Sequence, residues 1–176
     1  MKRSLCTLAV GLLIINSGFA KGLGQETLCQ KDERVLFSCP VRGGMKFVSL
    51  CSSRELSEKE GYLQYRFGRA GNVELEFPAQ RVHTQTMFRY SYYFRYQVER
   101  TTVSFNKHGY IYTIFDDYEG DSKPKMHQRG VQVTPPIAGQ KVTTLMCYGA
   151  TIGNLSDLKS IVPCDKDDPL NMGDCP

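Results

Sequence analysis

The chain has 176 residues, of which 41% are hydrophobic and 23% are charged, and it contains no Trp. This length suits one domain with a well-packed core and is short for two, and the balanced composition argues against disorder. The formal net charge of +4 is too small for a polycationic nucleic-acid-binding protein. Seven Cys residues stand out, and they point to an oxidising compartment rather than to a particular reaction.

The first 20 residues have the form of a secretory signal peptide. Two basic residues, Lys2 and Arg3, precede the short apolar run of residues 8–15, and small residues stand near the end of the segment. We therefore expect cleavage after Ala20, which leaves residues 21–176 as a single β-rich domain in the periplasm or outside the cell. The apolar run is much shorter than the roughly 20 residues that span a bilayer, so we expect no membrane span after cleavage.

Cleavage changes both the charge and the Cys count. Without Lys2 and Arg3, the 22 basic residues fall to 20 against 18 acidic ones, so the net charge is +2 and no nucleic-acid partner is expected. The Cys residues that remain form an even set, which in an exported chain predicts three disulfides. They are Cys29, Cys39, Cys51, Cys147, Cys164 and Cys175. Their spacing lacks the short C-x2-C pairs of a structural zinc site.

Part of the disulfide pattern follows from the expected strands. If residues 34–39 and 46–51 form a hairpin, Cys39 lies near its turn and Cys51 near its open end. The two are then too far apart to bond with each other, so we expect each to bond elsewhere. The long gap between Cys51 and Cys147 also predicts a bridge between the N-terminal third and the C-terminal part. The remaining connectivity stays open.

The segment after the leader reads as a series of short strands in which apolar and polar residues alternate. In chain order the expected strands cover 34–39, 46–51, 63–67, 73–77, 86–99, 102–106, 110–116, 131–134 and 142–148. We expect the longest, 86–99, to bend or bulge near its middle. Polar loops are expected at 52–61 and 117–129, and Asn154 is expected to cap a short helix. The fold class is therefore mainly β, an antiparallel sandwich or barrel of eight to nine strands with at most one or two short helices.

Residues suited to catalysis or metal binding are few. His83, His108 and His127 all fall in expected turns or loops, and none belongs to a known nucleophile or metal-ligand motif. If all the Cys residues of the cleaved chain are paired, no thiol is free to act as a nucleophile. The acidic tail from Asp165 to Asp174 has the oxygen ligands that Ca²⁺ prefers, but it lacks the spacing of a complete calcium loop. We therefore assign no catalytic residue, no metal and no cofactor.

The strongest candidate site is a recognition surface rich in Tyr and Arg, the residues that most often anchor interfaces. The expected loop 117–129 is long for a hairpin connection and carries both charges, a form suited to insertion into a partner's cleft. The competing interpretation is structural, because arginines on the wet face of a sheet pair with its Glu residues. The candidate residues are Arg89, Tyr93 and Arg95 on strand 86–99, Tyr62 and Arg66 near strand 63–67, and Tyr118, Glu119 and His127 in the loop.

A resemblance rests on four stretches: Phe37-Ser-Cys39, the Gly43-Gly44 turn, residues 46–50 and the segment GYLQYRFG at 61–68. With them the chain resembles uncharacterised small exported, periplasmic proteins of Gram-negative bacteria. Its opening is also similar, over a short stretch, to the start of the membrane-bound type of lysozyme inhibitor, a small periplasmic β-barrel. The Ser-Gly-x-Tyr inhibitory loop of that family is absent, and the nearest stretch, 108–111, differs from it. No functional residue is carried over.

Export, disulfides, the absence of a catalytic motif and the charged loop favour a binding protein. The first hypothesis is an inhibitor or immunity-type protein that contacts a cell-wall hydrolase or a toxin in the envelope. The alternative is a protein that binds carbohydrate or peptidoglycan fragments stacked on tyrosines, and a concave pocket lined by Tyr and Arg would favour it. The third hypothesis is an enzyme, which requires one of the three His residues to meet a carboxylate or a Ser in a cleft.

Overall fold

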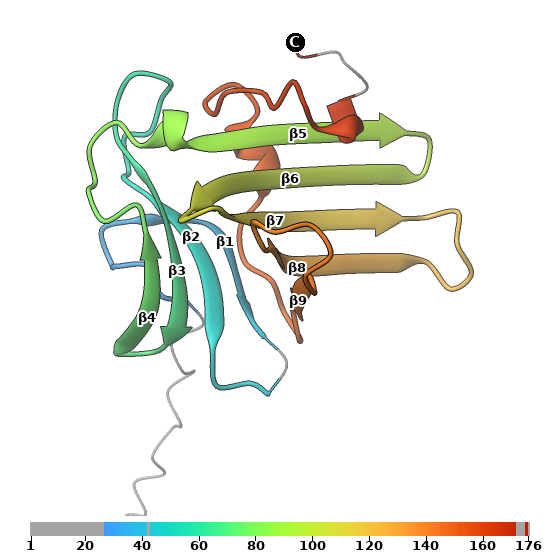
Figure 1. The fold of residues 1–176 in the computed structure, drawn as a ribbon, viewed down its shortest axis with the longest axis horizontal. Coiled ribbons are helices and arrows are strands. Elements are labelled where there is room, and N and C mark those ends of the chain that lie inside the picture. The colour runs from blue at the N-terminus through green and yellow to red at the C-terminus, as the bar shows by residue number, and fades with distance from the viewer. Residues whose placement is uncertain (1–26, 42, 172–174, 176) are drawn as a thin grey trace, which may run out of the picture.

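The computed structural model describes residues 27–41, 43–171 and 175, which form two antiparallel sheets (Figure 1). The first sheet has the order β1 (Arg34–Pro40), β2 (Phe47–Ser52), β3 (Leu63–Arg69) and β4 (Asn72–Phe77). The second has the order β5 (Phe88–Arg95), β6 (Val98–Lys107), β7 (Tyr110–Glu119), β8 (Met126–Thr134) and β9 (Thr143–Met146). The prediction of a mainly β, sandwich-like fold is confirmed.

Helical structure is confined, within the described residues, to three 3-10 segments: η1 (Gln85–Met87), η2 (Leu155–Leu158) and η3 (Pro169–Asn171). The side chain of Asn154 accepts a hydrogen bond from the backbone N–H of Ser156, so Asn154 caps η2 as expected. Across the described ranges, no helix has the length and apolar character needed to cross a bilayer. The expected signal peptide, residues 1–20, lies outside the described residues.

The two sheets share one hydrophobic core. Tyr65 of β3 contacts Phe105 of β6 with 5.0 Å between ring centroids, and Phe105 also stacks on Phe77 and Tyr112 at 4.4 and 4.9 Å. Leu155 and Leu158 of η2 are buried in the same cluster. The apolar residues that alternate along the strands therefore meet between the sheets, as the period-2 pattern predicts.

The second sheet is longer than the first along its strands. Strands β6 and β7 have ten residues each and therefore span about 33 Å. Strands β2 and β4 have six residues each and span about 20 Å. Figure 1 shows β5 to β8 running past the first sheet to the β5–β6 turn and the β7–β8 loop at their far end. We call the face of the second sheet that is turned toward the first sheet its inner face. The far part of this inner face extends beyond the first sheet and is not covered by it.

The C-terminal segment covers one edge of each sheet, β1 in the first and β5 in the second. Ser38 and Ile152 exchange backbone hydrogen bonds of 2.8 Å, which joins this segment to β1. Further along, residues 163–165 bond to both backbone groups of Tyr90, at 2.9 Å each, and so extend the free edge of β5. The two edges are thereby covered with backbone partners, which blunts their tendency to pair with another chain.

Three disulfides join all six Cys residues of the expected mature chain: Cys29–Cys51, Cys39–Cys147 and Cys164–Cys175. Cys39 and Cys51 bond elsewhere rather than with each other, as the hairpin geometry predicts. The Cys39–Cys147 bridge ties β1 to the segment after β9 and is the expected link between the N-terminal third and the C-terminal part.

The prediction of a single strand over residues 86–99 is wrong. This segment divides into η1, strand β5 and the start of β6, with a two-residue turn at Tyr96 and Gln97 between the strands. Gln97 has a φ of 62°, in the left-handed region that residues other than Gly, Asn and Asp seldom adopt. The turn therefore lacks the Asn-Gly or Asp-Gly signal by which a two-residue hairpin is normally found in a sequence.

The expected loop 117–129 is also largely wrong. Strand β7 continues to Glu119 and β8 begins at Met126, so only residues 120–125 form the connection. His127 lies on β8 rather than in a loop, and the expected strand 131–134 is the second half of that strand. The polar composition suggests a loop because this part of the hairpin has no core to face, whereas its backbone pairing is regular.

Removing the long-range disulfide should cost more stability than removing the short one. In the chain-entropy model, the bridge across 108 residues contributes about 5 kcal/mol and the bridge across 11 residues about 3 kcal/mol. We expect Cys39→Ala/Cys147→Ala to lower the free energy of unfolding more than Cys164→Ala/Cys175→Ala, as measured by urea denaturation. Equal losses in the two double variants would contradict the assigned pairing.

Candidate binding surfaces

The inner face of the second sheet changes from apolar to polar along its strands. Residues paired across neighbouring strands lie on the same face, so each cross-strand row can be followed through β5, β6, β7 and β8. One row is apolar and lies in the core: Tyr90, Val103, Ile114 and Val131. The next two rows toward the far end are largely polar: Tyr92, Thr101, Asp116 and Arg129, then Phe94, Glu99, Tyr118 and His127. The change in character falls where the first sheet no longer covers the second.

Asp116 is the centre of a hydrogen-bonded group on this polar part of the face. One carboxylate oxygen lies 2.5 Å from Nε2 of His127, and the other accepts a hydrogen bond of 2.9 Å from Nε of Arg129. The ring of Tyr118 meets the ring of His127 edge to face, with 5.7 Å between centroids. Because both oxygens of Asp116 already have partners, this group forms a fixed ion-pair network rather than a free acid or base.

A small cleft lies over this group, with a volume of about 250 Å³. We call it the polar cleft. Its sheet residues are Glu99, Thr101, Asp116, Tyr118, His127 and Arg129, and the segment Asn154, Leu155 and Ser156 covers one side. The sequence criterion for a small-molecule site, a concave pocket lined by Tyr and Arg, is met here by Tyr118 and Arg129.

The far end of the second sheet presents two exposed aromatic rings. Phe94 is 64% exposed and Tyr96, in the β5–β6 turn, is 82% exposed. The neighbouring β7–β8 loop holds this turn in place, because Arg95 forms a 2.8 Å ion pair with Asp121 and the backbone N–H of Gly120 donates to the carbonyl of Gln97. We call Phe94 and Tyr96 the aromatic tip.

The predicted recognition residues do not come together on one surface. Tyr118 and His127 lie on the inner face, whereas their neighbours along the strands, Arg89, Tyr93, Arg95 and Glu119, lie on the outer face. Arg95 pairs with Asp121, and Glu119 pairs with Arg100. For Arg95 and Glu119 the structure matches the competing interpretation, in which arginines of the wet face are paired with acidic residues. Arg89 instead donates to the backbone carbonyls of Thr86 and Phe88.

Tyr62 and Arg66 belong to a buried cluster in the first sheet, so the expectation of an exposed Arg66 is wrong. The side chain of Arg66 is only 2% exposed, and its guanidinium donates two hydrogen bonds, of 2.6 and 2.7 Å, to the carboxylate of Glu33. Glu76 and the Leu28 carbonyl accept from the same guanidinium, and the Tyr62 hydroxyl donates to Glu33 at 2.8 Å. Arg66 is therefore a structural residue that holds the segment before β1 against the sheet.

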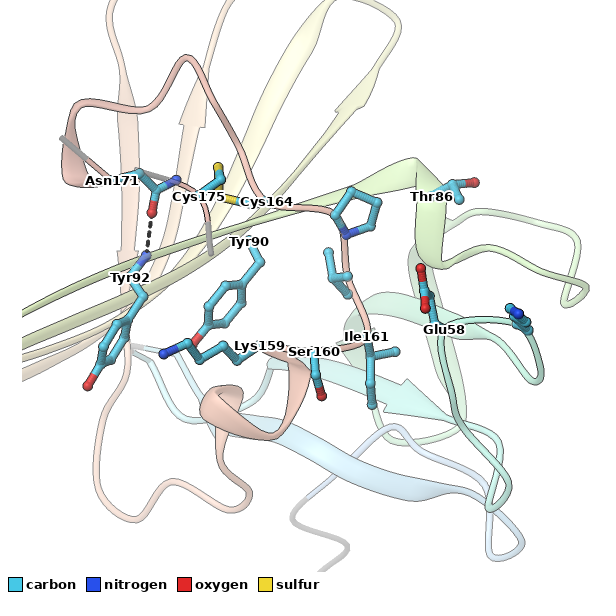
Figure 2. A pocket seen from close by; sticks show the side chains of 13 residues that line it. Glu58, Thr86, Tyr90, Tyr92, Lys159, Ser160, Ile161, Cys164, Asn171 and Cys175 are labelled. Atoms are coloured by element: carbon cyan, nitrogen blue, oxygen red, sulfur yellow. Dashed lines mark hydrogen bonds between the residues drawn. A yellow bond between two sulfur atoms is a disulfide. The ribbon is translucent and has the colours of Figure 1, made fainter. Parts of the chain in front are cut away.

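A larger cleft, with a volume of about 800 Å³, lies between β5 and the C-terminal segment. Figure 2 shows Tyr90, Tyr92 and Lys159 lining one part of it and Glu58 another, with a 3.0 Å hydrogen bond from the Tyr92 backbone to the side chain of Asn171. Nζ of Lys159 lies 5.0 Å from the centroid of the Tyr92 ring. None of the residues predicted from the sequence to bind a partner lines this cleft.

The described part of the acidic tail shows turn-capping contacts. A side-chain oxygen of Asp165 accepts from the backbone of Asp167, and one of Asp168 accepts from the backbone of Leu170. Asp174 lies outside the described residues. Elsewhere, Cys29, Glu33 and Cys51 lie close enough together to hold a metal ion, but the two Cys residues share a disulfide and Glu33 is paired with Arg66.

Comparison of the chain with protein-family models, with curated proteins and with solved structures finds no significant match. The function is therefore argued from the geometry of these surfaces.

Sequence reasoning missed four of the six sheet residues that line the polar cleft: Glu99, Thr101, Asp116 and Arg129. Thr101 and Arg129 carry no motif, and Glu99 looked like the end of a long strand. A signal was present, because Asp116, Tyr118, His127 and Arg129 alternate at period 2 on either side of the loop.

Replacing Glu33 should destabilise the fold strongly. Burial alone would raise the pKa of Glu33, but the hydrogen bonds from Arg66, the Gln30 backbone and Tyr62 outweigh burial and hold the pKa below its ordinary value. We expect Glu33→Gln to cost about 3 to 5 kcal/mol in urea denaturation at neutral pH, because Arg66 is left buried with only the partly exposed Glu76 as a countercharge. The control is Glu74→Gln, which breaks the half-exposed pair with Lys46 and should cost less than about 1 kcal/mol.

The same ion pair predicts a pH dependence. Because the pKa of Glu33 is lower in the folded chain, its contribution is complete above the ordinary value of 4.5 and is lost as the pH falls below that value. The free energy of unfolding should therefore decline more steeply between pH 5 and pH 3 in the wild type than in Glu33→Gln. Parallel declines would show that Glu33 is not ionised in the folded protein.

Proposed function

We propose that the protein is an exported binding protein that acts by protein–protein contact on a cell-envelope hydrolase or toxin, as an inhibitor or immunity-type protein. The observation that carries the proposal is the aromatic tip at the far end of the second sheet. Phe94 and Tyr96 lie two residues apart on one hairpin and are 64% and 82% exposed, more than the neighbouring pair Tyr110 and Ile111 at 42% and 44%. Exposed aromatic residues that gather in this way mark interaction sites.

The aromatic tip is suited to binding because it is preorganised. The β5–β6 turn is joined to the β7–β8 loop by the Arg95–Asp121 ion pair and the Gly120–Gln97 backbone bond, so two hairpin ends form one unit. Aromatic side chains lose little conformational freedom on binding, and a fixed backbone loses less still. An end of a sheet that projects past the core has the shape needed to enter a partner's cleft (Figure 1).

Export is the second part of the proposal. Three disulfides suit an oxidising compartment such as the periplasm, and the leader-like segment at residues 1–20 supplies a route to it. A partner in the cell envelope would meet the protein in that compartment.

Cleavage of the leader can be measured directly. When the full chain is produced in a Gram-negative host, we expect the protein in the periplasmic fraction to begin at Lys21 and to have its six Cys residues oxidised. Intact-mass and N-terminal peptide analysis of that fraction checks both points. A full-length chain recovered in the cytoplasm with free thiols would contradict export.

Binding through the aromatic tip can be tested with paired variants. We expect Phe94→Ser/Tyr96→Ser to weaken the complex with an envelope hydrolase or toxin at least 30-fold, since anchor residues contribute about 2 kcal/mol or more. The double variant should unfold at the same temperature as the wild type because both rings are exposed. The partner is captured on immobilised protein from a periplasmic extract, purified, and its affinity measured by calorimetry together with its enzymatic activity.

The matched control is Val82→Ser, which removes an apolar side chain that is 70% exposed on the loop between β4 and η1. This variant should bind as the wild type does. If the aromatic-tip variant and the wild type bind the partner with equal affinity, the aromatic tip is not part of the interface. A bound partner whose activity is unchanged would overturn the inhibitor proposal and leave only a binding role.

A further inference from the structure

The polar cleft has an unusual lining for its size. Of the nine residues around it, only Leu155 lacks a hydrogen-bonding side chain. Most ligand sites are chiefly apolar with a few polar groups, and this one is the reverse. Carboxylates that only accept hydrogen bonds stand beside Arg129, which only donates, and beside hydroxyls that do both. A ligand that matches the cleft must therefore offer donors and acceptors at close spacing.

The charges around the cleft disfavour an anionic ligand. Asp116 is already paired with Arg129 and bonded to His127, so its charge is compensated within the protein. Glu99 makes no ion pair among the described residues and leaves one uncompensated negative charge at the cleft. Burial and this nearby carboxylate raise the pKa of Tyr92. A ligand with many hydroxyl groups and no negative charge fits this field best.

A buried hydroxyl next to the lining of the polar cleft has unused hydrogen-bonding capacity, although its residue, Tyr90, lines the larger cleft rather than this one. Tyr90 is only 3% exposed, and its hydroxyl is buried without a hydrogen bond of regular geometry. Burial raises the pKa of Tyr90 to about 12, although the hydroxyls of Thr101 and Ser156 lie near enough to oppose the rise. Both of these neighbours also line the polar cleft. Buried polar groups are normally satisfied, so the unsatisfied Tyr90 hydroxyl beside Thr101 and Ser156 indicates spare hydrogen-bonding capacity directly behind the lining of the cleft.

We propose that the polar cleft binds one ring of a saccharide that carries no negative charge. Its volume of about 250 Å³ lies just below the roughly 300 to 1,000 Å³ of drug-sized ligand sites, which suits a single ring better than a longer chain. The hydroxyls of Thr101 and Ser156 and the carboxylate of Glu99 bond the sugar hydroxyls. Tyr118 supplies an aromatic surface at the side, as aromatic rings commonly do for sugars. This site is separate from the aromatic tip and does not depend on the proposed protein partner.

Three matched sugars test the charge argument. N-Acetylglucosamine is neutral, glucosamine is cationic at neutral pH, and glucuronate is anionic. In an NMR titration of the isotopically labelled protein we expect N-acetylglucosamine to bind in the millimolar range and to shift the amides of residues 99–101, 116–118, 127–129 and 154–156. Glucuronate should bind at least fivefold more weakly because the unpaired Glu99 repels it, whereas glucosamine should bind at least as well as N-acetylglucosamine. Equal binding of glucuronate and N-acetylglucosamine, or shifts confined to other residues, would overturn the proposal, and so would the absence of shifts at the highest soluble concentration.

Two nearly isosteric variants locate the site. Thr101→Val removes one hydroxyl of the polar cleft, whereas Thr113→Val makes the same change on the outer face of β7. We expect the first to weaken N-acetylglucosamine binding at least tenfold and the second to leave it unchanged, with similar unfolding temperatures for both. Unchanged binding in folded Thr101→Val contradicts the site. Phe94→Ser/Tyr96→Ser should retain sugar binding, so failure of the protein-partner proposal and failure of this one are distinguishable.

Discussion

The central constraint in this structure is the difference in length between its two sheets. Burial between the sheets supplies the hydrophobic stabilisation, but the shorter sheet covers only one part of the longer one. Strands β6 and β7 must continue with polar residues where this cover ends, because an apolar row there would face water. The same backbone register therefore presents core residues at one end and a hydrogen-bonding surface at the other.

Both proposed sites follow from this arrangement. The polar cleft lies between the C-terminal segment and the polar rows that the first sheet leaves uncovered. The aromatic tip lies at the far end of the same sheet, where β5 turns into β6. A site built on paired strands is held more precisely than one on a long loop. The buried pair of Arg66 and Glu33 has a different role, because it lies in the first sheet and fixes the N-terminal segment against it.

The sequence predicted the strands that face the core and failed where strands have no core to face. Alternation of Leu63, Tyr65 and Phe67 located β3, because period 2 reports burial on one side. The same pattern suggested an exposed Arg66, since it cannot report that Glu33, far upstream, covers the other side. The far ends of β7 and β8 were taken for a loop because their polar composition is that of a loop. Register, which sequence alone does not determine, places His127 beside Asp116.

The central claim is that the uncovered end of the second sheet is the binding surface. Covalent side-chain footprinting of the protein in the periplasm of living cells, compared with the purified protein, tests it most directly. The account predicts lower labelling of Phe94, Tyr96, Tyr118 and His127 in the cell, with unchanged labelling of exposed residues on the first sheet such as Val73. Equal labelling of the sheet end in both settings, or protection confined to the first sheet, would contradict it.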